Sequence, residues 1–261
     1  LGSDKEVLEL LQSGDIAFAF GIPAAKLSSF LPEWDALTLP YLFQSEQEMI
    51  DWTRSEASKI MFEKLERGGF KGISYSSFSM RVPLSNKPLR SIEDFKGLKI
   101  RVMGTPVAID TYKALGASSV PMPFGEVYIA LQTGVVDACE NGTATLYGQR
   151  FYEVADYLST LAVLPSLSLT LMSKKVWDSL SQEEQKAIMD AEPEVFETTK
   201  NALFALNEKG LTEMKKAGIE IIEPVNPEDF SRALRGVWDK YLPKFEPWVQ
   251  DIVKGILGDR Y

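Results

Sequence analysis

The segment from Gly97 to Gly142 constrains the fold of this chain more than any other. Its first apolar residues, Leu98, Ile100 and Val102, alternate with basic residues, which is the pattern of a strand with one buried face. Further along, glycines end two helical patterns, and a short strand follows each of them. This alternation of strands and helices with short joints predicts an α/β fold with a parallel sheet.

Two polar residues lie at the predicted strand ends of this segment. Arg101 is near the end of the first strand, and Asn141 follows the last one. In parallel sheets, small ligands bind beyond the carboxyl ends of the strands. Thr105 and Pro106 fit the start of a helix that Thr105 can cap, and free N–H groups at such a start attract anions. An arginine there is suited to a carboxylate or phosphate; the alternative is a weak surface ion pair and a turn asparagine.

The absence of histidine narrows the chemistry open to this chain. It removes Ser-His-Asp and Cys-His catalysis and every His-ligated metal site, and we expect neither a metal nor a cofactor. The 261 residues carry 37 acidic and 28 basic side chains, a net charge of −9 that disfavours a nucleic-acid partner. No apolar run is long enough to span a bilayer, and the single Cys139 cannot form an intrachain disulfide.

Other patterns predict the elements around this segment. A long helix should begin at the capping sequence Ser45–Glu48 and run through Leu65. Strands are predicted for residues 70–76 and 161–172. The longest helical pattern runs from residue 181 toward residue 216, and Pro193 should kink or break it.

Two stretches of sequence resemble a known family. Residues 99–141, KIRVMGTPVAIDTYKALGASSVPMPFGEVYIALQTGVVDACEN, are similar to the solute-binding proteins of tripartite ATP-independent periplasmic (TRAP) transporters. The family run carries K-I/L-R-V and F-x-E-V-Y-x-A-L-Q, and the match has no gap. Residues 76–102, SSFSMRVPLSNKPLRSIEDFKGLKIRV, resemble the family's second signature. This signature is an arginine followed by a polar strand, an S/T-N-x-P turn and a short D-x-K-G-L-K helix. The resemblance begins part-way into the family's first domain, so we expect its opening strand and helix to be missing.

The resemblance implies a two-lobed periplasmic-binding-protein-like fold with hinge strands and a long helix that spans both lobes. Lobe I would comprise residues 1–78 and 167–206, and lobe II residues 79–166 and 207–261. A small organic acid would bind between the lobes and be delivered to a TRAP membrane permease. The acid is left open among dicarboxylates, sugar acids, keto acids and aromatic acids. The resemblance further implies a periplasmic location, a monomer and no enzymatic activity.

The resemblance also assigns site residues. Arg101 would hold the substrate carboxylate, with Arg81 as a second arginine and Asn141 as a cleft asparagine. The remaining expected ligand-binding residues are Phe124, Thr105 and Ser3, with Asp4 beside Ser3.

Three departures from the family pattern bear on this assignment. Gly142 replaces the usual proline and is expected to loosen the loop, while Pro83 makes the strand pairing after Arg81 uncertain. The family often carries a histidine near Val163, and this chain has none.

Two other functions fit the same scaffold. An enzyme acting on a small carboxylate would need a base, and Glu126 and Glu140 are the nearby candidates. A helix-surface charge and a strand-end ion pair are the simpler roles for these two residues. An acid-sensing receptor module is the third alternative, and sequence does not separate it from a transport protein.

Overall fold

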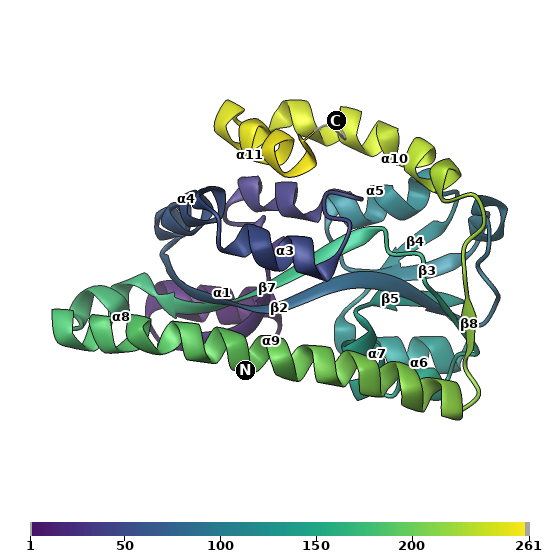
Figure 1. Ribbon diagram of the computed structural model, residues 1–261, viewed down its shortest axis with the longest axis horizontal. Coiled ribbons are helices and arrows are strands. Elements are labelled where there is room, and N and C mark those ends of the chain that lie inside the picture. The colour runs from purple at the N-terminus through teal and green to yellow at the C-terminus, as the bar shows by residue number, and fades with distance from the viewer. Residues whose placement is uncertain (1, 259–261) are drawn as a thin grey trace.

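The long strand β2 (Phe70–Ser85) connects the two halves of the molecule in the computed structural model, which describes residues 2–258 (Figure 1). From Phe70 to Arg81 it pairs antiparallel with β7 (Leu164–Ser173), and from Val82 to Ser85 it pairs antiparallel with β5 (Ala138–Asn141). β2 therefore changes partners directly after Arg81. The strand was expected to end at residue 76, which is wrong because neighbouring strands hydrogen bond to its polar second half.

β2 belongs to a mixed sheet whose strands follow the order β1-β7-β2-β5-β3-β4, with β6 paired to β2 and β8 paired to β6. The other strands are β1 (Phe18–Pro23), β3 (Lys99–Val102), β4 (Ser118–Pro121), β6 (Tyr157–Ser159) and β8 (Glu220–Ile222). β3 is parallel to both β4 and β5, with Arg101 opposite Val120 and Cys139. The parallel arrangement predicted for this segment is confirmed. Pro83 does not interrupt the ladder, since it lies opposite Glu140.

Helices cover both sides of the sheet (Figure 1). The α-helices are α1 (Asp4–Ser13), α2 (Ala24–Leu27), α3 (Glu46–Thr53), α4 (Glu56–Lys64), α5 (Pro106–Ala114), α6 (Val127–Gln132), α7 (Thr143–Gly148), α8 (Lys174–Ser179), α9 (Gln182–Lys216), α10 (Pro227–Tyr241) and α11 (Pro247–Leu257). Short 3-10 helices are η1 (Pro32–Thr38), η2 (Leu65–Gly68), η3 (Ile92–Phe95), η4 (Phe124–Glu126), η5 (Phe151–Glu153) and η6 (Leu242–Lys244). The single helix expected from residue 45 to 65 is divided, because Ser55 caps a new helix, α4.

α9 runs along the whole length of one side of the molecule (Figure 1). Of the kink or break expected at Pro193, the break is wrong, since α9 runs without interruption over 35 residues. The residue before the proline is firmly held: Glu192 accepts hydrogen bonds from Arg54 at 3.0 and 3.1 Å and from Ser74 at 2.6 Å. The Arg54 guanidinium also stacks 3.5 Å from the Phe196 ring centroid. These contacts attach the part of α9 around the proline to Arg54, at the end of α3, and to β2.

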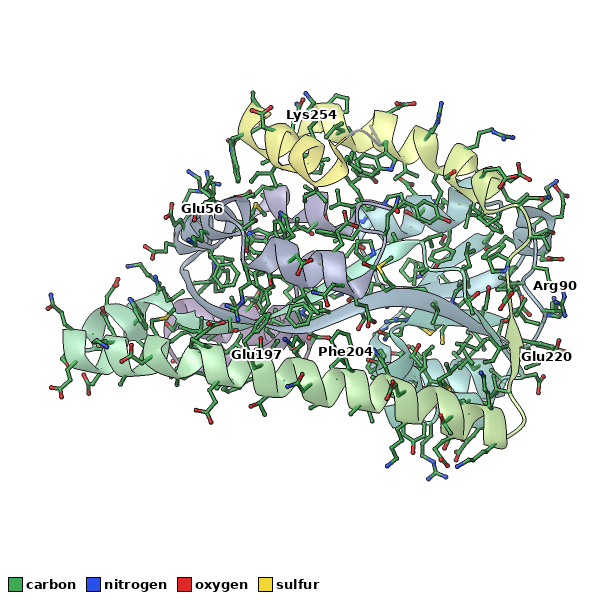
Figure 2. The ribbon with its side chains drawn as sticks, in the orientation of Figure 1. Glu56, Arg90, Glu197, Phe204, Glu220 and Lys254 are labelled. Carbon is green, nitrogen blue, oxygen red and sulfur yellow. The ribbon has the colours of Figure 1, made fainter. Side chains whose placement is uncertain are left out.

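The largest apolar core includes side chains from helices on both sides of the sheet, such as Phe230 of α10 and Phe196 of α9 (Figure 1). Trp34, Phe95 and Phe230 are fully buried there. Figure 2 shows Phe204 on α9, whose ring is partly buried against the same core. A second cluster joins α6, α7 and the last turns of α9 through Leu131, Leu146 and other apolar side chains. No helix within residues 2–258 is both long and apolar enough to cross a membrane.

Candidate ligand site

A buried ion pair between Arg81 and Glu140 lies where β2 changes partners. Their side chains are 4% and 0% exposed. Arg81 Nη2 donates to a Glu140 carboxylate oxygen at 3.0 Å and to the Glu140 backbone carbonyl at 2.9 Å, and Nε donates to the other carboxylate oxygen. Nη1 makes longer bonds, at 3.2 Å to Asn141 Oδ1 and 3.4 Å to Ser166 Oγ. The strand-end ion pair expected for Glu140 is confirmed, and its partner is Arg81.

The pKa of Arg81 reflects this pairing. Burial is the largest influence on the pKa and lowers it, but the charge and hydrogen bonds of Glu140 together raise it above its ordinary value. Arg81 therefore stays protonated, and most of its charge is already balanced by a carboxylate.

Arg101 has a different environment, although it lies only two strands away. It is 3% exposed, and Nε and Nη2 donate to the Met122 backbone carbonyl at 3.2 and 2.9 Å. Within residues 2–258 it forms no ion pair. Its pKa is lowered, chiefly by burial and also by the charge of Arg81, while Glu140 acts in the opposite direction. This guanidinium is thus a buried cation that a carboxylate would stabilise strongly.

Thr105 occupies the N-cap position of α5, as predicted, but its side chain does not cap the helix. Its backbone N–H donates to the Met103 carbonyl at 2.7 Å. The hydroxyl is buried and has no hydrogen-bond partner in the described part of the chain. A buried hydroxyl at a helix N-terminus is suited to an anionic ligand, because both the hydroxyl and the free N–H groups can donate to it.

Asn141 and Phe124 lie beside the two arginines. Asn141 Oδ1 accepts from Arg81 and, at 2.9 Å, from the N–H of Gly142. The Phe124 ring centroid is 5.7 Å from the Arg101 guanidinium carbon, and the ring is 39% exposed. The structure therefore brings four predicted site residues together around the ends of β3 and β5, namely Arg81, Arg101, Asn141 and Phe124. A fifth, Thr105, follows the end of β3.

Ser3 is not part of this group in the described structure. It is exposed at the start of α1, where it forms a capping box with Glu6 and donates to that carboxylate at 2.8 Å. No hydrogen bond joins Ser3 to either arginine among the described residues. Asp4, half-buried, is the first residue of the same helix.

The loop after Asn141 is tightly packed. A Cβ atom at Gly142 would lie 2.6 Å from Cβ and Oγ of Ser79 on β2. The loosening expected from the glycine is therefore not seen; glycine permits a close approach that proline would prevent.

Tyr112 is a site neighbour that sequence reasoning missed. Its phenol is fully buried on α5, lies within electrostatic range of Arg81 and Glu140, and has no hydrogen-bond partner in the described region. Burial raises the pKa of this phenol well above its ordinary value. The spacing could have indicated this residue, because Tyr112 lies two helical turns after Thr105 and therefore on the same face of the helix.

The sequence is similar to those of known periplasmic binding proteins. The chain is 32% identical to the C4-dicarboxylate-binding periplasmic protein DctP of Rhodobacter capsulatus, over 93% of this chain and 71% of that protein. It is 30% identical to the 2,3-diketo-L-gulonate-binding periplasmic protein YiaO of Escherichia coli, over 98% and 78% of the two chains.

Solved structures agree with these sequence relatives. A TRAP periplasmic solute-binding protein of Bradyrhizobium in complex with galacturonate superposes with a TM-score of 0.92 at 30% identity, over 98% of this chain and 85% of that one. One from Citrobacter koseri with bound D-glucuronate gives 0.90 at 30% identity, over 98% and 84%. The expected two-lobed fold is thereby confirmed. The family model for bacterial extracellular solute-binding proteins, family 7, matches residues 1–244, and this chain belongs to that family of transport proteins.

Proposed function

We propose that this chain captures a small organic acid between its two lobes in the periplasm and delivers it to a TRAP-type membrane permease. The observation that carries this proposal is the buried guanidinium of Arg101, which forms no ion pair within residues 2–258. The buried, unpartnered hydroxyl of Thr105 supports it. The relatives named above are described as binding dicarboxylates, a diketo sugar acid and uronates, which all present a carboxylate.

In this proposal Arg101 grips the carboxylate through Nη1, which makes no hydrogen bond in the described structure, and Thr105 donates its hydroxyl. Phe124, a half-exposed ring beside the Arg101 guanidinium, flanks the ligand. Arg81 acts as the second arginine through Nη1, the nitrogen with its longest hydrogen bonds. Asn141 offers its amide nitrogen, while Ser3 remains a sequence prediction for one wall of the site.

The proposed lobes are residues 1–78 with 167–206, and 79–166 with 207–261. Between them the chain crosses in β2, in β7 and in α9. The partner change of β2 after Arg81 lies close to the first crossing, which is the position expected of a hinge strand. Closure of the lobes would exclude water and strengthen the arginine–carboxylate contact. We further propose that the protein acts as a monomer and binds no nucleic acid.

A ligand panel tests the proposal. Thermal unfolding should be measured with uronates, aldonates, dicarboxylates and keto acids, each beside a neutral analogue such as galactose for galacturonate. A true ligand at about 100 times its dissociation constant should stabilise the protein by about 2.7 kcal/mol. Neutral analogues should fail, because they would leave the buried guanidinium unpaired. An absence of any carboxylate-dependent shift would reject the proposal.

Substitution of the central arginine gives the sharper test. Arg101→Ala should weaken binding of the carboxylate ligand by about 2–5 kcal/mol in calorimetry, the range for losing one partner of a buried charge pair. Arg235→Ala is the matched control, since Arg235 is exposed on α10. Equal affinities in the two variants would remove Arg101 from the site.

No observation favours an enzyme. Glu140 is engaged by Arg81, and Glu126 is exposed at the end of η4. The family consists of solute-binding components of transporters.

A further inference from the structure

Asn207, in the second half of α9, connects three elements that are far apart in the sequence. Its Oδ1 accepts a hydrogen bond from the backbone N–H of Ala144 at 2.8 Å. Its Nδ2 donates to the two carboxylate oxygens of Glu46, on α3, at 3.2 and 3.4 Å. Ala144 lies in the first turn of α7. A single amide group therefore bridges α3, α9 and α7.

The bond to Ala144 replaces a missing helix cap. Gly142 is the N-cap residue of α7 and has no side chain with which to accept from the first turn. Asn207 supplies that acceptor from another helix. Because Asn141 directly precedes this cap, the bond fixes the backbone next to a proposed ligand residue.

Glu46 reaches the other side of the site. The Met80 backbone faces its carboxylate, and Met80 directly precedes Arg81 on β2. Burial raises the pKa of Glu46, whereas the contacts with Met80 and Asn207 act in the opposite direction. The carboxylate is thus a half-buried group whose charge depends on these two partners.

From these contacts we infer that Asn207 and Glu46 are positioning residues, which hold Asn141 and Arg81 in place without touching the ligand. The inference rests on the proposed function and on the proposed lobes. Glu46 belongs to lobe I, Ala144 belongs to lobe II, and Asn207 lies where α9 crosses between them. The Glu46–Asn207 bond therefore ties the arrangement of the lobes to the geometry of the site.

Binding measurements test this role. Asn207→Ala should weaken binding of the acid identified in the ligand panel by at least tenfold. Asn201→Ala removes the same kind of side chain from an exposed position on α9 and should leave the affinity unchanged. Amide hydrogen exchange without ligand should be faster in residues 143–146 of Asn207→Ala than in the control.

A polarity swap separates positioning from general stability. Asn207→Asp keeps an acceptor for Ala144 but places a carboxylate against Glu46, and it should weaken binding. Adding Glu46→Gln should restore affinity, because the glutamine amide can then donate to the aspartate. Rescue of this kind is not expected from a residue that only stabilises the fold, and the pair remains informative if Asn207→Ala does not fold.

The outcomes are distinct from those for the proposed function. If the wild type binds an acid, and Asn207→Ala matches Asn201→Ala in affinity and exchange, the positioning role is overturned while the transport proposal stands. A failure of Glu46→Gln to rescue Asn207→Asp also overturns it. If the wild type binds no acid, the transport proposal fails, and exchange at residues 143–146 still decides whether Asn207 holds this turn.

Discussion

At the scale of single residues, the two arginines differ in what already balances their charge. Arg81 is paired with Glu140, whereas among the described residues Arg101 donates only to a backbone carbonyl and lies against an aromatic ring. Under the proposed function, Arg101 is therefore the main partner of the carboxylate, while Arg81 also holds the ends of β2 and β5 together through Glu140. On that proposal, selectivity for carboxylates would depend chiefly on Arg101 and not on a general excess of positive charge.

The Arg81–Glu140 pair leads to a stability prediction. Arg81→Ala should lower the free energy of unfolding by about 3–5 kcal/mol, because Glu140 is left as an unpaired buried carboxylate. Urea unfolding measures this change. Arg150→Ala is the control, since it breaks an exposed ion pair with Glu153 and should cost less than about 1 kcal/mol. Similar losses in the two variants would mean that the buried Arg81–Glu140 pair contributes no more to stability than the exposed Arg150–Glu153 pair.

Sequence reasoning found some of these residues and not others, for a physical reason. The proximity of Arg101 and Asn141 could be predicted from the sequence, because parallel strands bring their carboxyl ends to one edge of the sheet. The contacts of Asn207 could not be predicted, since its partners are 63 and 161 residues away and the helical pattern around it does not indicate them. The pairing of Arg81 with Glu140 depends on the register of β2 against β5, and the alternation of apolar and polar residues does not fix that register.

At the scale of elements, strand β2 and helix α9 hold the two halves of the molecule together. The β3–β5 segment could be predicted well, since glycines mark its joints and its apolar pattern is regular. The extent of β2 could not, because polar residues such as Ser77 and Ser79 enter it only through pairing with β7. The continuity of α9 through Pro193 was not predicted either, and the contacts that Glu192 makes there come from distant parts of the sequence.

The close contact between β2 and the start of α7 can be tested with glycine substitutions. Gly142→Ala should destabilise the protein by about 1–3 kcal/mol, because its new methyl group would overlap Ser79. Gly236 lies inside α10, and a Cβ atom added there would have no neighbouring atom within 4 Å. Gly236→Ala should instead stabilise the protein by about 0.5–1 kcal/mol. Chemical unfolding would show whether each substitution lowers or raises the free energy of unfolding. A neutral Gly142→Ala would mean that this contact is loose in solution.

At the scale of the whole molecule, the proposed function requires the lobes to approach each other when the acid binds. Cys139 is 1% exposed, and burial raises the pKa of its thiol to about 12, so it should not react with thiol-specific dyes. Exposed Ile60 and Ile129 lie in different proposed lobes and can each be replaced by cysteine for labelling.

The labelled pair Ile60→Cys/Ile129→Cys should show a shorter inter-dye distance when a bound acid closes the lobes. Ile129→Cys/Val135→Cys, with both positions in proposed lobe II, should show no change. Single-molecule energy transfer would measure both pairs. A protein that binds the acid with an unchanged cross-lobe distance would argue against closure and against the proposed lobe boundaries.

The buried guanidinium of Arg101, which forms no ion pair within residues 2–258, has a practical consequence for binding experiments. Bacterial lysates are rich in acetate, succinate and similar metabolites, and citrate is a common buffer. Under the proposed function, the site should retain such molecules through chromatography, so titrations of freshly purified samples should report displacement and understate the intrinsic affinity. Unfolding in urea, washing and refolding in chloride salts should free the protein of these contaminants and reveal its preferred nutrient.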